Sequence, residues 1–357
     1  MQTSIAAPLV AQVAWSMVTA FCVTAILGEV VLRLARRLSL NDQPDREQHK
    51  AHSTQVPNIG GVAITLGLLA GILAVTLPVL TQTRWLILTL LGMIALHLLG
   101  LVDDRRGLGA WLKLSIQALV AIAIVTLGEV RVLTLLDDTV PGGYLISTSL
   151  SVLWLLVICN AINFLDNMDG LASSVSAVAA MVFLAAALLT GQSEVAWLSA
   201  AAAGGCLGFL LHNAPPARMY MGDGGSLVLG LALGVISIQL TYVQADNGEI
   251  IWYGVLTPLI VLAVPVYDFL SVVLLRLRAG RSPMSADRNH LSHRLVRLGL
   301  NPPAAVGLIA ILTLATGLGG VLLAALTGWQ ALLVAAQTLA ILTLVAIFES
   351  LGSSTDR

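Results

Sequence analysis

The feature that most constrains this chain is the recurrence of apolar runs of about 20 residues along its length. An α-helix of that length crosses the hydrocarbon core of a bilayer. Because 57% of the 357 residues are hydrophobic and only 10% are charged, the runs are too many and too long for a water-soluble core. We therefore predict an all-α polytopic membrane protein in which residues 1–357 form one integral membrane domain.

The pattern predicts about eleven transmembrane helices, separated by short polar gaps. The expected spans are 9–34, 59–81, 84–102, 112–128, 148–163, 171–191, 194–212, 225–243, 251–277, 303–325 and 329–350.

The basic residues predict how these spans are oriented. With the N-terminus outside and the C-terminus in the cytoplasm, 16 of the 18 Lys and Arg fall on the cytoplasmic side, and only Arg84 and Arg131 lie outside. This asymmetry is the one that the positive-inside rule describes. Every acidic cluster discussed below then lies on the cytoplasmic face.

One predicted outer segment, residues 129–147, alternates partly between apolar and polar residues and contains Pro-Gly-Gly. This pattern fits a small β-hairpin on the outer face, and it fits an irregular loop equally well.

The first polar gap of chemical interest is LGLVDDRRGLGAWLKL at 99 to 114. Asp103 and Asp104 end one predicted span and Lys113 begins the next, so two carboxylates and a cation face each other across a Gly-rich turn. Such a group can hold a cation-bound phosphate. A charge cluster that only marks the membrane boundary explains an isolated Asp-Asp pair as well.

A second gap, NAINFLDNMDGL at 160 to 171, repeats a polar side chain every three residues. If the helix continues, Asn160, Asn163, Asp166 and Asp169 share one face, since residues three apart on a helix are neighbours. Amide and carboxylate oxygens in this number suit Mg²⁺ or Mn²⁺. Asn167 instead has the character of a turn former.

The third gap, MYMGDGGS at 219 to 226, flanks Asp223 with glycines. Backbone amides there can approach a phosphate while the carboxylate binds a metal, and Tyr220 can stack on a base. A Gly-Asp-Gly turn alone is common and unspecific.

The fourth gap, DRNHLSHRL at 287 to 295, follows the basic residues Arg276, Arg278 and Arg281. It contains Arg288 and places His290, His293 and Arg294 on one helical face. The two histidines suit Zn²⁺, but no third ligand is obvious, so phosphate binding is the stronger interpretation. A loop that is merely positive-inside is the alternative.

With a fifth element, PNIGG at 57 to 61, these motifs resemble the polyprenyl-phosphate N-acetylhexosamine-1-phosphate transferases of glycosyltransferase family 4, in the same order from about residue 50 to 300. The resemblance implies a single membrane transferase domain that moves a sugar-1-phosphate from a UDP-sugar to a polyprenyl phosphate, such as undecaprenyl phosphate, and releases UMP. It implies Mg²⁺ as the cofactor, with Mn²⁺ as a candidate substitute. Members begin cell-envelope polysaccharides such as O-antigen, teichoic acid and peptidoglycan.

The resemblance also implies roles for individual residues. Asp103, Asp104 and Lys113 would form the catalytic centre, with Lys113 and Asp103 at the lipid phosphate, and Asn163 and Asp223 would bind the metal. The expected nucleotide and sugar contacts are Asp166, Asp169, Tyr220, Arg288, His290, His293 and Arg294.

One position departs from the family pattern. The last motif of the family often reads His-x-His-His, and Ser292 here replaces the middle histidine. Peptidoglycan-branch members usually keep all three histidines, so the departure favours a smaller donor, most simply UDP-GlcNAc, over the phospho-MurNAc-pentapeptide transferase alternative. The Asp-Gly-Leu-Ala-Ser run at 169 to 173 lacks the Arg that a CDP-alcohol phosphotransferase requires.

The expected setting is the bacterial inner membrane with the active site on its cytoplasmic face. The expected partners are the UDP-N-acetylhexosamine, the polyprenyl phosphate and the lipid bilayer, with a homodimer as a candidate assembly and no nucleic acid. A secondary transporter is the rival from another class, because broken helices and membrane acids also suit ion coupling. The acids cluster in loops on one side, which favours the enzyme.

Overall fold

The computed structural model describes residues 7–37, 56–76, 83–240, 252–284, 289–323 and 326–353. Helices account for nearly all of these residues, and no strand occurs within these ranges. The longer helices, in chain order, are α1 Ala7–Arg37, α2 Gly60–Thr76, α3 Arg84–Arg106, α4 Ala110–Leu127, α6 Gly143–Leu165, α7 Leu171–Leu189, α8 Ser193–Asn213, α9 Asp223–Gln239, α11 Ala263–Arg278, α13 Pro302–Leu322 and α14 Gly328–Ser353. The shorter ones are α5 Leu136–Thr139, η2 Trp252–Val255, α10 Leu256–Val261 and α12 Leu291–Arg297.

The all-α membrane fold predicted from the apolar runs is confirmed. Eight described helices are long and apolar enough to cross a bilayer, while α2 and α9 are apolar but shorter. The predicted span at 251–277 is broken into η2, α10 and α11. Pro265 has no N–H to bond the carbonyl of Val261, and the two helices separate at Leu262. Residues 77–81, 241–243 and 251, at the ends of predicted spans, lie outside the described ranges.

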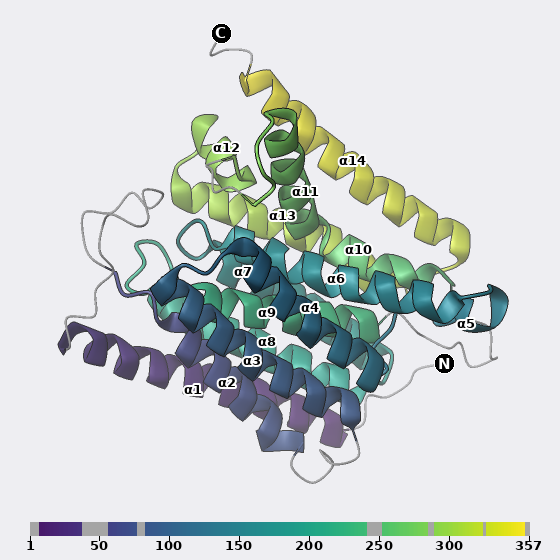
Figure 1. Cartoon of the computed structure of the whole chain (residues 1–357), viewed down its shortest axis with the longest axis horizontal. Helices are drawn as coiled ribbons and strands as arrows, with labels where there is room; N and C mark the ends of the chain where they lie inside the picture. The colour runs from purple at the N-terminus through teal and green to yellow at the C-terminus, as the bar shows by residue number, and fades with distance from the viewer. Residues whose placement is uncertain are drawn as a thin grey trace.

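The core is built around α8 and α9, which are buried along almost their whole length. Helix α1 packs closely on α8 because Gly204 and Gly208, four residues apart, let the backbone carbonyls of Met17 and Phe21 approach. A Cβ atom at either glycine would collide with these carbonyls, as expected of small residues at membrane helix contacts. Figure 1 shows α1, α2 and α3 stacked on one side of this core, with α13 and α14 on the other.

The segment at 129–147, predicted to lie on the outer face, forms no β-hairpin. It is an irregular loop that leads into α5 and then α6, so the loop alternative is the correct one. The hydroxyls of Ser147 and Ser151 bond the backbone of Val132, which leaves no edge for a partner strand. Two hydrogen bonds from the Arg131 guanidinium fix Asp137 and hold the pKa of that carboxyl below its ordinary value.

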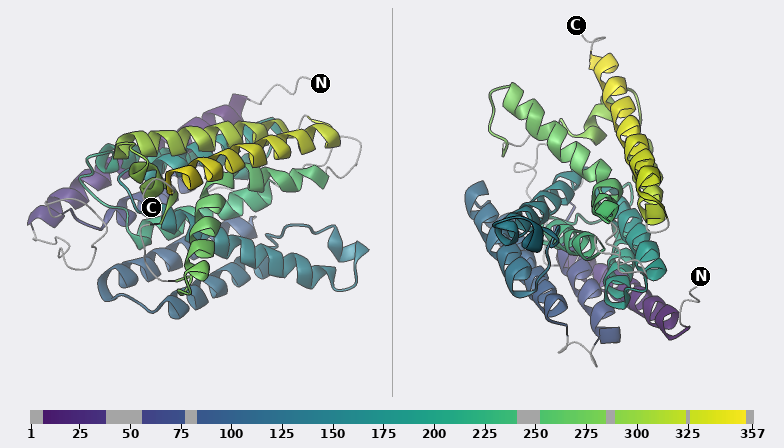
Figure 2. Two further views of the ribbon diagram at one scale, coloured as in Figure 1. Left: turned by 90° about the horizontal axis from the view of Figure 1, so that it is seen from above. Right: turned by 90° about the vertical axis from the view of Figure 1, so that its right-hand side faces the viewer.

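The motif-bearing helix ends gather at one end of the bundle, opposite α5 (Figure 1). Helices α3, α6, α8 and α11 end there, and α4, α7, α9 and α13 begin there, because consecutive spans run antiparallel. Helix α12 lies at the same end. Helix α14 runs along the periphery and is the least buried of the candidate spans (Figure 2). The fold therefore places all the sequence motifs described above on one face.

Candidate active site

Lys113 lies between two carboxylates at the centre of this end. Its Nζ is 3.1 Å from Oδ2 of Asp103 and forms a second, closer ion pair with Oδ2 of Asp223. The tight turn between α3 and α4 makes this possible: Gly107 adopts φ 64°, and the amide of Leu108 donates to Oδ1 of Asp103 at 2.6 Å. A cation thus sits between acids from two helices that are far apart in the sequence.

Asp104 points away from this cluster, because adjacent helical residues are about 100° apart. Its carboxylate accepts from the amides of Asp223 at 3.1 Å and Gly224 at 3.4 Å, and from Nδ2 of Asn58 at 3.3 Å. It caps the positive N-terminus of α9. Gly222, at φ 68°, has no room for a side chain, since a Cβ there would lie 2.6 Å from Oδ2 of Asp104.

The condition for a shared helical face as far as Asp169 is not met, because α6 ends at Leu165. The Nδ2 of Asn167 donates to the carbonyl of Phe164 at 2.6 Å and closes the helix end, which is the turn-forming role expected of it. Asp166 still lines the same cavity as Asn160 and Asn163, and Asp169 does not. Asp166 and Asp169 accept from the backbone amides of Gly222, at 3.2 Å, and Ala217, at 2.9 Å.

Asn163, on the last turn of α6, still faces the centre. Its Nδ2 donates to Oδ1 of Asp223 at 2.7 Å and to Oγ of Ser226 at 2.9 Å. The carboxylate of Asp223 is thereby held from two sides, by Lys113 and by Asn163.

The fourth motif is held by a buried acid on α11. Asp268 is fully buried and accepts from the ring of His290 at 3.0 Å and from the amide of Leu291 at 2.6 Å. Arg294 turns away from the centre: its guanidinium donates to Ser271 at 2.8 Å and to Glu349 of α14 at 2.9 Å.

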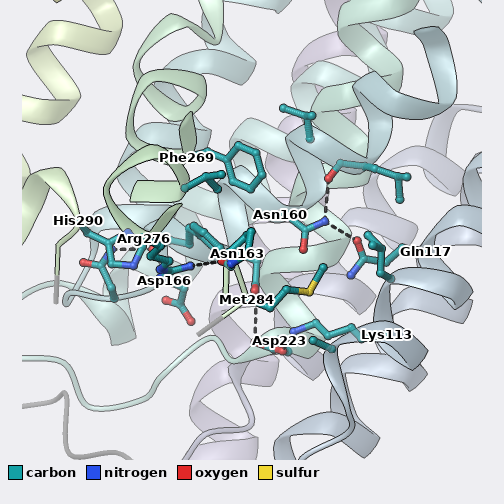
Figure 3. Close-up of a pocket in the computed structure, with 18 of the residues that line it drawn as sticks. Lys113, Gln117, Asn160, Asn163, Asp166, Asp223, Phe269, Arg276, Met284 and His290 are labelled. Carbon is teal, nitrogen blue, oxygen red and sulfur yellow. Dashed lines mark hydrogen bonds and ion pairs between the residues drawn. The ribbon is translucent and has the colours of Figure 1, made fainter. Parts of the chain in front are cut away.

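A cavity of about 570 Å³ opens beside these groups (Figure 3). One end is polar and charged, and the other is walled by aliphatic and aromatic side chains of α4, α6 and α11. The polar lining includes Lys113, Asn163, Asp166, Asp223, Arg276, His290 and His293. The apolar lining includes Leu114, Leu153, Leu156, Val157, Phe269 and Val273. The wall from α11 begins at Phe269, past the break between α10 and α11.

The predicted site residues therefore divide into three groups. Those that line the cavity are Lys113, Asn163, Asp166, Asp223, His290 and His293. Those that lie near it but outside its lining are Asp103, Asp104, Asp169, Tyr220 and Arg294, with Tyr220 packed against Val56 and Ala217. Arg288 lies outside the described residues.

Three residues of this region were given no role in the site by the sequence analysis. Asn58 bonds Asp104, and Arg276 lines the cavity, lies 4.9 Å over the ring of Phe164 and donates to the carbonyl of Pro283. Gln117 lines the cavity one turn past Lys113. A signal for Gln117 was present, because an amide four residues after Lys113 interrupts an apolar run on the same helical face.

The side-chain oxygens at the centre of the site are of the type that magnesium prefers. Within the described ranges, no group of three or more His, Cys, Asp or Glu is arranged as a metal site. Magnesium, however, needs only one or two protein oxygens when substrate phosphates complete its shell. Asp223 and Asn163 lie together and supply such oxygens, provided that the amide of Asn163 turns its oxygen toward the shared position that its nitrogen now faces.

Comparison with known proteins identifies the family of this chain. The model of glycosyl transferase family 4 matches residues 86–241. A probable undecaprenyl-phosphate N-acetylglucosaminyl 1-phosphate transferase of Bacillus subtilis is 32% identical over 313 residues, which cover 87% of this chain and 84% of the relative. A decaprenyl-phosphate N-acetylglucosaminephosphotransferase of Mycobacterium leprae is 34% identical over 79% of this chain and 76% of the relative. A phospho-N-acetylmuramoyl-pentapeptide-transferase of Moorella thermoacetica is 35% identical over 62% of this chain and 74% of the relative.

Fold and site together define a polytopic helical membrane protein with an amphiphilic cavity that opens onto a cluster of acids and a lysine. Its similarity to the Bacillus relative extends over most of both chains. The chain belongs to glycosyl transferase family 4.

Proposed function

We propose that this protein transfers N-acetylhexosamine-1-phosphate, most simply GlcNAc-1-phosphate, from a UDP-sugar to polyprenyl phosphate and releases UMP. The observation that carries the proposal is the two-ended cavity, in which apolar walls lead to Lys113, Asn163 and Asp223. A lipid phosphate has the same two-ended chemistry. The printed names of the relatives that match most of the chain describe N-acetylglucosamine phosphate transfer to undecaprenyl or decaprenyl phosphate.

The acceptor would enter with its chain along the apolar walls and its phosphate at Lys113. A phosphate monoester has a second pKa near 6, so at pH 7 it is mostly a dianion and needs little activation. Its oxygen attacks the β-phosphorus of the UDP-sugar, the bond from that phosphorus to the UMP oxygen breaks, and UMP leaves. Lys113 offsets charge on the acceptor, and Asp103, 3.1 Å from Lys113, orients the nucleophile or removes a remaining proton.

Asp223 and Asn163 would hold the metal at the polar end of the cavity. When bound there, Mg²⁺ supplies charge neutralisation to the pyrophosphate. Asp104 fixes the amides that start α9 and so fixes the position of Asp223. The chain thus contributes binding, orientation and a pre-arranged carboxylate.

The donor would occupy the opposite wall, formed by the His290 segment and α11. His290, His293 and Arg276 converge there on the cavity and suit a sugar pyrophosphate. The replacement of a family histidine by Ser292 favours an N-acetylhexosamine donor over the larger muramoyl-pentapeptide donor. Ser292 is buried and donates to Oδ1 of Asn167 at 2.5 Å, so it belongs to the support of this wall.

The distribution of Lys and Arg supports a location of this end of the bundle on the cytoplasmic face of a bacterial inner membrane, where a UDP-sugar is available. The N-terminus would then be outside and the C-terminus inside. A homodimer remains a candidate assembly and needs no residue of the site.

The test is a donor panel. Purified protein in detergent receives undecaprenyl phosphate with UDP-GlcNAc, UDP-GalNAc or UDP-MurNAc-pentapeptide, and UMP release and lipid-linked product are measured. UMP release with UDP-GlcNAc supports the proposal, and release with the pentapeptide donor alone supports the peptidoglycan alternative. No UMP release with any donor, together with solute flux in proteoliposomes, would favour a transporter.

A further inference from the structure

Gln117 carries a buried hydrogen-bond donor that is paired with no acceptor among the described residues. The side chain lines the cavity and is 2% exposed, and its Nε2 has no hydrogen-bond partner among the described residues. An amide N–H buried without a partner is costly, so such groups are rare unless a ligand or water completes them. Here the unsatisfied donor belongs to a cavity wall.

Asn160 fixes which end of the Gln117 amide is free. The Nδ2 of Asn160 donates to the carbonyl of Leu156 and to Oε1 of Gln117, both at 2.8 Å. Because the carbonyl of Leu156 can only accept, the atom of Asn160 that faces it must be the nitrogen. The same nitrogen faces Gln117, so Gln117 must accept through its oxygen. The nitrogen of Gln117 is left without a partner, and in Figure 3 it lies on the side of Lys113.

Gln117 and Asn160 lie at the same depth in the cavity. Gln117 is four residues past Lys113 on α4, and Asn160 is three residues before Asn163 on α6, so both lie about one helical turn deeper than the charged end. Beyond them the walls are apolar, with Leu153 and Leu156 among the lining residues. The two side-chain amides therefore lie between the charged end of the cavity and its apolar walls, and they are polar without being charged.

We propose that the Nε2 of Gln117 donates to the ester oxygen that joins the phosphate to the first carbon of the polyprenyl chain, and that Asn160 is the positioning residue that aims it. This inference rests on the proposed function. With the phosphate at Lys113 and the tail along Leu153 and Leu156, the ester oxygen is the phosphate oxygen nearest the tail. It therefore reaches the level of Gln117 first.

A neutral amide donor suits the ester oxygen. The ester oxygen accepts hydrogen bonds but carries less charge than the terminal phosphate oxygens, so a neutral donor can satisfy it without the desolvation cost of a second buried cation. The amide also marks where the phosphate stops, because a phosphate moved deeper would leave Lys113 and enter the apolar walls.

The first experiment is Gln117→Met, which keeps the length of the side chain and removes the donor. We expect KM for undecaprenyl phosphate to rise about tenfold, as for one lost hydrogen bond, with KM for the UDP-sugar unchanged. Ser115→Ala is the matched control on α4, because Ser115 is exposed and bonds only the carbonyl of Trp111 of its own helix. An unchanged lipid KM in an active Gln117→Met enzyme would overturn the inference.

A second measurement tests the ester oxygen itself and does not depend on the stability of the variant. The acceptor is compared with a polyprenyl phosphonate in which a CH₂ group replaces that oxygen, at a pH where both are dianions. Wild type should show a KM about tenfold higher for the phosphonate, and Gln117→Met should show nearly equal values. Equal discrimination by both proteins would disprove the contact. If the proposed function itself fails, wild type transfers nothing to either lipid, a different result.

Discussion

The Nδ2 of Asn163 donates to Oδ1 of Asp223 at 2.7 Å, which joins the end of α6 to the first residue of α9. Lys113 pairs with the other oxygen of the same carboxylate. Asp223 is thus the one side chain that contacts both the cation from α4 and the amide from α6, and the first prediction concerns it.

We expect a chelator to abolish turnover and Mg²⁺ or Mn²⁺ to restore it, because Asp223 and Asn163 supply oxygens suited to these ions. Asp223→Ala should be inactive even with excess metal, while its melting temperature in detergent confirms that it folds. Asp138→Ala, an exposed carboxylate at the opposite end, is the matched control and should behave as wild type. Turnover by Asp223→Ala in metal-free buffer would refute the assignment.

Much of the fold could be predicted because backbone hydrogen bonding inside a bilayer allows few solutions. Long apolar runs become helices, and the break near Pro265 follows from its missing N–H. The convergence of the motifs on one end also follows, since consecutive spans must alternate in direction.

The side-chain directions at the site could not be predicted in the same way. Asp103 and Asp104 are adjacent in sequence, yet one meets Lys113 of α4 and the other meets the amides of α9. The three-residue repeat places Asn160, Asn163 and Asp166 in one cavity, but Asp169 falls outside it because α6 ends at Leu165. Arg294 shares a short helix with His293 but bonds α14, which lies 55 residues further on at Glu349. Each of these outcomes depends on tertiary partners that no local pattern contains.

The Arg294–Glu349 pair gives a second prediction. Both side chains are 11% exposed, and Glu349 also accepts from the hydroxyl of Tyr267 at 2.7 Å. Glu349→Gln should lower the free energy of unfolding by about 1 to 3 kcal/mol, because it removes the nearer of the two carboxylates that pair with Arg294 and leaves only Asp268, whose Oδ1 is 3.9 Å from the guanidinium. Arg294→Met should destabilise similarly, and the double variant should be no worse than either single one.

The same variants decide whether Arg294 contacts the substrate. If its role is to tie α12 to α14, Glu349→Gln and Arg294→Met should change KM for the UDP-sugar alike. A donor KM that rises in Arg294→Met and stays at the wild-type value in Glu349→Gln would show instead that the guanidinium meets the sugar or pyrophosphate.

A third prediction concerns orientation in the membrane. In a Cys22→Ala background, where the remaining Cys159 and Cys206 are buried, Arg106→Cys should react with an impermeant maleimide only from the cytoplasm. Asp138→Cys, at the end of the bundle that carries α5, should react only from outside. Both substituted positions are exposed. The reverse labelling pattern would overturn the orientation inferred from Lys and Arg.

The last prediction separates two mechanisms through Asp103, which lies 3.1 Å from Lys113 at the head of the acceptor groove. If this carboxylate only orients or deprotonates the lipid phosphate, Asp103→Asn should lower kcat by about 10² to 10⁴, the range for a lost general base. Residual activity should rise with pH, because the acceptor becomes fully dianionic as pH exceeds its second pKa. Nucleotide binding should persist. A covalent mechanism at Asp103 requires a variant that is dead at every pH and a wild type that, given UDP-sugar without lipid, releases one equivalent of UMP and becomes phosphorylated. Because the proposed binding of the acceptor would bring a dianionic nucleophile beside Lys113, we expect direct displacement and no such burst.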